Sequence, residues 1–297
     1  SGLSGTQGVM ANIPDVTTIP YFTTVPHNPL DPSNPAFGPL IPTLNGIFGQ
    51  INQVFAFLGV PERSIVFSET AASPVVISDE SLVNLSAQIT GVLNASPTFP
   101  AFVQSFGLPA EAAPLVANLL GIVYGQARQA TDDDLLVLPS STVIGTVNTN
   151  FAAFLQSQGL PANLAAQFSA EGVSLPLEDK WVVIPAEKTE IANATAGYNA
   201  SIQAAASAAG YAFVDANAFM QQLAAGGVTD GDHTLTANLV TGGAFSLDGV
   251  HPTSRGYALI ANLFMKAIDA TYGSNFEASG NLVDIGDYPT NYSPTLQ

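Results

Sequence analysis

Residues 245–257 read Phe-Ser-Leu-Asp-Gly-Val-His-Pro-Thr-Ser-Arg-Gly-Tyr, and residues 258–265 continue as Ala-Leu-Ile-Ala-Asn-Leu-Phe-Met. The pattern predicts a loop that leads into a helix, with Pro252 in the first helical turn, where a proline loses no hydrogen bond. Apolar residues then recur at helical spacing and predict one buried face, made of Leu259, Ile260, Leu263, Phe264 and Ile268. We therefore expect a loop that is held on a firmly packed helix.

Two residues of this loop can do acid–base chemistry. Asp248 and His251 are three positions apart, so both side chains can point into one cleft. A carboxylate beside an imidazole fixes its tautomer and stabilises its cation, as in the base half of a Ser-His-Asp triad. The alternative is an aspartate that caps a turn and a histidine on the surface.

The sequence Asp-Gly-Val-His-Pro at 248–252, with Thr253, Gly256 and an apolar C-terminal helix after it, resembles the last motif of the SGNH or GDSL ester hydrolases. Residues 8–20 resemble the buried strand and loop that follow the Gly-x-Asn-Asp motif of that family. The resemblance implies a three-layer α/β/α, flavodoxin-like fold with a parallel sheet. It also implies ester hydrolysis with Asp248 and His251 as catalytic residues, without a cofactor or a metal.

The chain departs from the family at the nucleophile. The family carries its serine in a Gly-Asp-Ser-like motif, and a later Gly and a Gly-x-Asn-Asp motif supply oxyanion donors. None of these motifs occurs here, and Ser4 precedes the first expected strand instead of following one. We expect the chain to be the C-terminal part of a longer hydrolase, inactive without its missing N-terminal segment. The alternative is a catalytically inactive binding or structural protein of the cell envelope.

Composition limits the partners. The 297 residues include 23 acidic and 6 basic side chains, for a formal net charge of −17, which disfavours binding to nucleic acid. We expect a small-molecule or lipid ester as substrate. The absence of cysteine is compatible with an extracellular or bacterial cell-envelope location. The longest apolar stretch, residues 112–124, is interrupted by Pro114 and Asn118, so we expect no membrane-spanning segment.

The chain order predicts a core that is split by an insertion. Short β-prone runs at residues 9–13 and 211–215 are typical of core strands, and residues 185–209 form an alanine-rich helical pattern with one apolar face. We assign residues 1–35 and 181–297 to the incomplete hydrolase core. Residues 36–180 are expected to be a mainly helical insertion or cap, which we interpret as a lid or a wall for an acyl chain.

Other segments carry weaker signals. Prolines are dense over residues 14–42 and predict an irregular, extended loop, and residues 64–67 and 74–77 favour two short strands. The acidic runs at 132–134 and 230–233 contain the residue types that bind metals. Their spacing does not favour a closed site, so we interpret the first as a solvated loop and the second as a polar turn.

Overall fold

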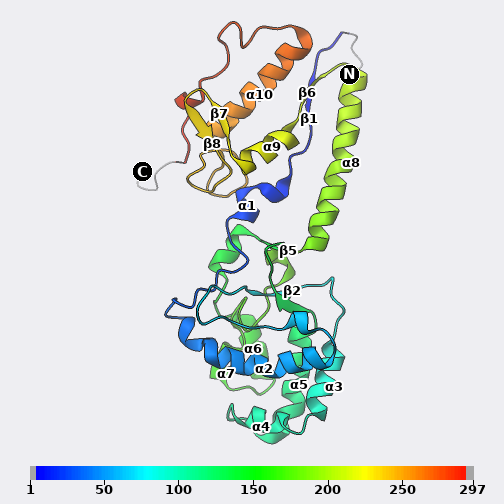
Figure 1. The fold of residues 1–297 in the computed structure, drawn as a ribbon, viewed down its shortest axis with the longest axis vertical. Coiled ribbons are helices and arrows are strands. Elements are labelled where there is room, and N and C mark those ends of the chain that lie inside the picture. The colour runs from blue at the N-terminus through cyan, green and yellow to red at the C-terminus, as the bar shows by residue number, and fades with distance from the viewer. Residues whose placement is uncertain (1–4, 292–297) are drawn as a thin grey trace. The chain divides into compact units, whose positions relative to one another are not determined.

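The computed structural model describes residues 5–291, and the chain forms two compact units (Figure 1). We call Ser1–Thr24 with Ala186–Gln297 the dyad unit, because it contains Asp248 and His251, and Val25–Pro185 the helical unit. The interpretation of residues 36–180 as an insertion into a hydrolase core stays a prediction.

The dyad unit contains a short parallel sheet. Strand β1 (Val9–Ala11) pairs with β6 (Ala212–Val214) in register, Val9 opposite Ala212, and the two lie side by side in Figure 1. Helix α9 (Ala216–Ala225) follows β6, and α10 (Ser254–Tyr272) packs against both strands. Both strands fall within the runs predicted from the sequence, and the fold is α/β.

Amide side chains fix the carboxyl ends of these two strands. The side chain of Asn199 accepts a hydrogen bond from the Ile13 N–H at 2.7 Å and donates to the Ile13 carbonyl at 2.9 Å. Asn12 donates to the Asp215 carboxylate at 2.8 Å and accepts from the Asn217 N–H at 2.9 Å. The loop after β1, which leads toward the expected site, therefore starts from a fixed position.

Helix α8 (Pro185–Ala209) has the predicted limits, but the predicted buried face is wrong. Ala206 is the one buried residue among those of this helix, and Tyr198, on the expected apolar face, is 61% exposed. Packing of an amphipathic face normally stabilises a helix of this length. Here that face lacks cover from the part of the chain that the structure describes.

The remaining elements of the dyad unit are short. A 3₁₀ turn (Val16–Thr18) and the one-turn helix α1 (Pro20–Thr23) interrupt the loop that the prolines predicted to be irregular. The expected polar turn at residues 230–233 is the turn of a hairpin, β7 (Val228–Asp230) paired antiparallel with β8 (His233–Leu235). A second 3₁₀ turn covers Ile285–Asp287.

Helix α10 begins later than the proline suggested. Thr253 is its N-cap, and its hydroxyl accepts a hydrogen bond from the Gly256 N–H at 3.0 Å. The same hydroxyl donates to the Gly243 carbonyl at 2.6 Å. This bond ties the helix start to the chain before the loop that carries Asp248 and His251, which we call the dyad loop. Pro252 thus precedes the helix, and the placement in the first turn was wrong because the threonine side chain supplies the better cap.

The helical unit is built from six α-helices among the described residues and two antiparallel strand pairs. The helices are α2 (Ile41–Phe57), α3 (Ser86–Ala95), α4 (Phe99–Gln104), α5 (Ala113–Tyr124), α6 (Thr149–Ser157) and α7 (Ala162–Gln167). The strand pairs are β2 (Val76–Ser78) with β3 (Ala127–Gln129), and β4 (Leu135–Leu136) with β5 (Val182–Val183). Phe48, Phe55 and Tyr124 lie in its core with at most 1% of their surface exposed.

The strand predicted at residues 64–67 is wrong, although the chain there is extended. The side chain of Asn52 accepts from the Ile65 N–H and donates to the Ile65 carbonyl, both at 2.8 Å. Asn45 bonds the backbone of Phe67 in the same way, at 2.8 and 2.9 Å. Both amides come from α2, so side chains satisfy the backbone groups that a neighbouring strand would otherwise satisfy.

One residue of the acidic run at 132–134 has a structural partner. Asp134 is buried, and its two oxygens accept hydrogen bonds from the Arg128 guanidinium at 2.7 and 2.8 Å. Arg128 also bonds Asp79, which is buried, at 2.6 Å. The interpretation as a solvated loop holds for Asp132 and Asp133, which are exposed, and is wrong for Asp134.

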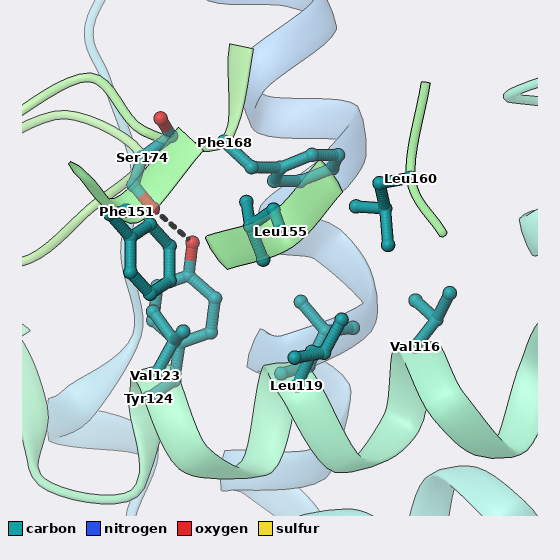
Figure 2. A pocket seen from close by; sticks show the side chains of 10 residues that line it. Val116, Leu119, Val123, Tyr124, Phe151, Leu155, Leu160, Phe168 and Ser174 are labelled. Carbon is teal, nitrogen blue, oxygen red and sulfur yellow. Dashed lines mark hydrogen bonds between the residues drawn. The ribbon is translucent and has the colours of Figure 1, made fainter. Parts of the chain in front are cut away.

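Figure 2 shows a small apolar cavity in the helical unit, where α5 faces Phe151 and Leu155 of α6. Its volume is about 40 Å³, and the Tyr124 hydroxyl at its edge donates to the Ser174 carbonyl at 2.6 Å. A void of this size is a packing gap. No helix within residues 5–291 is long and apolar enough to cross a membrane.

Candidate active site

The loop that carries Asp248 and His251 is closed by its own backbone. The Thr253 N–H donates to the Ala244 carbonyl at 2.9 Å, and the Ser246 N–H donates to the His251 carbonyl at 2.8 Å. A β-bridge joins Phe245 and Pro252, so the two arms run antiparallel. The loop therefore presents its tip, residues 247–250, in a defined shape on the N-terminal end of α10.

A glycine at the tip holds the loop against α1. Gly249 has φ of 71°, in the left-handed region, and its carbonyl accepts a hydrogen bond from the Tyr21 N–H at 3.0 Å. A Cβ atom at Gly249 would lie 2.7 Å from the Tyr21 nitrogen, which is too close. Both the backbone conformation and the close approach require glycine here. Gly249 thus holds the loop against the segment that follows β1.

The two side chains predicted to act together are hydrogen-bonded. Oδ2 of Asp248 lies 2.6 Å from Nδ1 of His251. Oδ1 accepts three further hydrogen bonds, from the Ser246 hydroxyl at 2.7 Å and from the Val250 and His251 N–H groups at 2.9 Å. Both carboxylate oxygens therefore have hydrogen-bond partners, and Oδ2 is bonded to the imidazole.

These donors keep Asp248 ionised. The Ser246 hydroxyl and then His251 are the largest influences that hold the pKa of the Asp248 carboxyl well below its usual range, and two backbone N–H groups add to them. An ionised carboxylate can only accept hydrogen bonds, so Nδ1 of His251 is the donor. The lone pair of neutral His251 then resides on Nε2, which is the nitrogen that can take a proton.

The imidazole faces solvent in the described chain. The side chain of His251 is 70% exposed and that of Asp248 is 50% exposed. Among residues 5–291, no serine or threonine hydroxyl is hydrogen-bonded to Nε2, and the Ser246 hydroxyl is bonded to Asp248. Ser4 lies outside the described residues. The site thus holds an imidazole and the carboxylate that orients it, and residues 5–291 place no serine or threonine hydroxyl on the free ring nitrogen.

Sequence reasoning did not find two contributors to this arrangement. Ser246 lies two residues before Asp248 and bonds its carboxylate, and a serine at that spacing is the available signal. The Gly249–Tyr21 hydrogen bond joins segments 228 positions apart in the chain, so no local pattern predicts it.

A family model described as GDSL-like lipase/acylhydrolase matches residues 104–264, more than half of the chain, and the match includes Asp248 and His251. The chain belongs to this family. Its class is therefore that of ester hydrolases, in agreement with the resemblance read from the dyad loop, and the α/β fold agrees with it. No curated protein and no solved structure matches the chain significantly.

Proposed function

We propose that the protein hydrolyses carboxylic esters by a Ser-His-Asp mechanism in which this chain supplies His251 and Asp248. The observation that carries the proposal is the 2.6 Å contact between Asp248 Oδ2 and His251 Nδ1, which leaves Nε2 as the basic nitrogen. This geometry is the one that a general base of a serine hydrolase needs.

In this mechanism His251 acts twice. Nε2 accepts the hydroxyl proton of a serine as its oxygen attacks the ester carbonyl, and His251 then donates that proton to the departing alcohol. A water molecule, deprotonated in the same way, releases the acid and restores the serine. Asp248 stays ionised throughout, because its four hydrogen bonds favour the anion, and it stabilises the imidazolium.

We assign the serine and the oxyanion donors to a segment outside Ser1–Gln297. Two observations support this assignment. The family motifs that carry these groups are absent from the sequence. Within residues 5–291, β1 pairs with no strand other than β6, and α8 leaves its apolar face exposed, so the dyad unit has surface to receive a further strand and its connections.

The absent nucleophile also favours a second candidate. On that account the chain is a binding or structural protein that keeps a hydrolase scaffold without the reaction. For either candidate we propose an extracellular or bacterial cell-envelope location, which the lack of cysteine permits.

The test uses the protein produced together with its upstream coding region. We expect His251→Ala to lower the turnover of p-nitrophenyl esters by about 10³-fold or more, because the base for both proton transfers is lost. His27→Ala is the matched control, since His27 is a half-buried histidine of the helical unit, and it should leave turnover unchanged. A loss under about tenfold for His251→Ala would rule out its role as the base.

A further inference from the structure

The hydroxyl of Ser246 belongs to the hydrogen bonds around Asp248 and His251. It donates to Oδ1 of Asp248 at 2.7 Å, from a half-buried residue two positions earlier in the chain. Within residues 5–291 it is the one hydroxyl that is hydrogen-bonded to either member of the pair. Its partner is the carboxylate, whereas an attacking serine is hydrogen-bonded to the free nitrogen of the imidazole. The position of Ser246 is therefore not that of a nucleophile.

The hydroxyl helps to fix the rotation of the Asp248 carboxylate. The terminal torsion of an aspartate is broad and roughly two-fold, so the carboxylate plane is not set by the side chain itself. Oδ1 accepts from the Ser246 hydroxyl and from the N–H groups of Val250 and His251, and Oδ2 then lies 2.6 Å from Nδ1 of His251. Of the three donors to Oδ1, the hydroxyl is the one that a side-chain substitution removes without changing the backbone.

The orientation of the carboxylate matters because the imidazole is exposed. The His251 side chain is 70% exposed, so water competes for both of its ring nitrogens. In a neutral histidine, the hydrogen bond at one ring nitrogen decides which nitrogen carries the proton. If the carboxylate turned away from Nδ1, the proton could move to Nε2. Nε2 could then no longer accept the proton of a serine.

Charged residues of the two segments that contact the dyad loop bond other groups. Nε of Arg255, in the first turn of α10, donates to the Tyr288 carbonyl at 2.9 Å. Asp15, after β1, accepts from the N–H and the hydroxyl of Thr17 at 3.0 and 2.6 Å. Control of the His251 tautomer therefore rests on the Asp248 carboxylate and its donors.

We propose that Ser246 is a positioning residue of the active site, whose hydroxyl holds the Asp248 carboxylate in the orientation that keeps the His251 proton on Nδ1. The inference rests on the proposed function and adds a residue to the same site. It leaves Nε2 free for a serine other than Ser246. Loss of the Ser246 hydroxyl should therefore weaken catalysis without ending it.

The tautomer of His251 can be measured without turnover. We would label the histidines of residues 1–297 and record the NMR shifts of their ring nitrogens at a pH where the imidazoles are neutral. In the unmodified chain, His251 should carry its proton on Nδ1. In Ser246→Ala a large fraction of molecules should carry it on Nε2, whereas Ser246→Thr, which keeps a hydroxyl, should behave as the unmodified chain does. His27 and His233, the other two histidines, are internal controls and should not change.

Ser254→Ala is the matched control, because Ser254 begins α10 and has no hydrogen bond to Asp248 or His251. It should leave the tautomer unchanged. Hydrogen exchange of the Tyr21 N–H checks that each variant keeps the dyad loop in place. Ser246→Cys, whose thiol is a weak donor, is the second variant if Ser246→Ala disturbs the loop. A His251 tautomer that is the same with and without the Ser246 hydroxyl would overturn the proposal.

Turnover separates a positioning role from that of the nucleophile. In the protein with its upstream region, Ser246→Ala should lower kcat for p-nitrophenyl acetate by about tenfold, because only the fraction of His251 in the productive tautomer can act. KM should change little, and Ser246→Thr should restore kcat. A loss of about 10³-fold or more in Ser246→Ala would contradict the proposal, because a loss of that size is expected for the nucleophile.

The two proposals fail separately. An unchanged tautomer in Ser246→Ala, with a turnover that His251→Ala removes, contradicts the role of Ser246 alone. A tautomer that shifts as expected, in a protein whose turnover His251→Ala leaves intact, contradicts the catalytic role of His251 alone.

Discussion

The two units differ in how completely they cover their own apolar surface. In the helical unit, α2, α3 and α5 enclose aromatic side chains such as Phe48 and Tyr124 that are almost fully buried. In the dyad unit, Ala206 is the one buried residue described in α8, and Leu263 and Phe264 of α10 are half-buried around a cavity. The helical unit thus has an extensively buried core, whereas the dyad unit has a smaller core and leaves more of its apolar side chains partly exposed.

The largest expected effect concerns the buried ions of the helical unit. Arg128→Met would leave the carboxylates of Asp79 and Asp134 buried without their cation, which should lower the free energy of unfolding by about 3–5 kcal/mol. Urea unfolding followed by the fluorescence of Trp181, the single tryptophan, reports on this unit.

The control is the exposed ion pair of the same unit. Lys180 and Glu178 are 2.7 Å apart, but their side chains are more than half exposed. Glu178→Gln should therefore leave the urea midpoint unchanged. Equal shifts for Arg128→Met and Glu178→Gln would contradict the view that the helical unit is held by a buried core.

A smaller effect is expected in the dyad loop. Gly249→Ala forces a side chain into the left-handed region and against the Tyr21 nitrogen, a cost of about 1–2 kcal/mol before the contact is counted. The Tyr21 N–H should lose its hydrogen bond to Gly249, so its hydrogen exchange should accelerate by about tenfold or more. Unfolding of the helical unit should not change.

Gly273→Ala separates backbone strain from the clash. Gly273 caps α10 with φ of 68°, and no atom lies within 4 Å of the position of its Cβ. This variant should carry similar strain and leave exchange of the Tyr21 N–H unchanged. If both variants accelerate that exchange equally, the loop is not held by its contact with α1.

The smallest effect depends on pH. Burial is the main cause that raises the pKa of the Glu171 carboxyl, and Glu178 adds to it, while Asn148 and Lys180 oppose it. The folded helical unit therefore keeps the Glu171 proton to a higher pH than the unfolded chain does. The free energy of unfolding falls as pH rises through the raised pKa, because the folded state must then lose this proton or hold a buried charge.

Glu171→Gln should remove the loss of stability that Glu171 causes as pH rises. Oε1 of Glu171 accepts from Asn148 at 2.7 Å, an interaction that glutamine keeps, while Oε2 is buried and has no partner among the described residues. The variant should be more stable than the unmodified protein at pH 7 and equally stable near pH 4. Glu111→Gln, at an exposed site, should show no such difference. A variant that is less stable at pH 7 would contradict the burial argument.

The sequence predicted the features that depend on residues close together in the chain. The Pro185–Ala209 limits of α8 follow from a proline at the start and Gly210 after the end, and the spacing of Asp248 and His251 is enough to bring them together in one loop. The three-residue spacing therefore predicted the Asp248–His251 pair. It did not predict which distant segments contact the loop.

What the sequence did not predict depends on distant side chains. Residues 64–67 are β-prone, yet Asn45 and Asn52 of α2 bind their backbone, so no strand forms. Asp134 reads as part of a solvated acidic run, and only the position of Arg128 in the fold makes it a buried partner. The cavity of about 280 Å³ in the dyad unit is likewise a product of packing, because its wall comes from segments far apart in the chain, such as those of Ile19 and Leu263.

The most direct test of the central claim is hydrolysis of p-nitrophenyl acetate and butyrate by purified residues 1–297, alone and mixed with the separately produced upstream segment. The account predicts no enzymatic rate for the chain alone, because within residues 5–291 no serine hydroxyl is hydrogen-bonded to Nε2 of His251 and the family's oxyanion motifs are absent from the sequence. It predicts a rate in the mixture that His251→Ala removes. Hydrolysis by the chain alone that disappears on His251→Ala would contradict it, because the nucleophile would then lie within these residues.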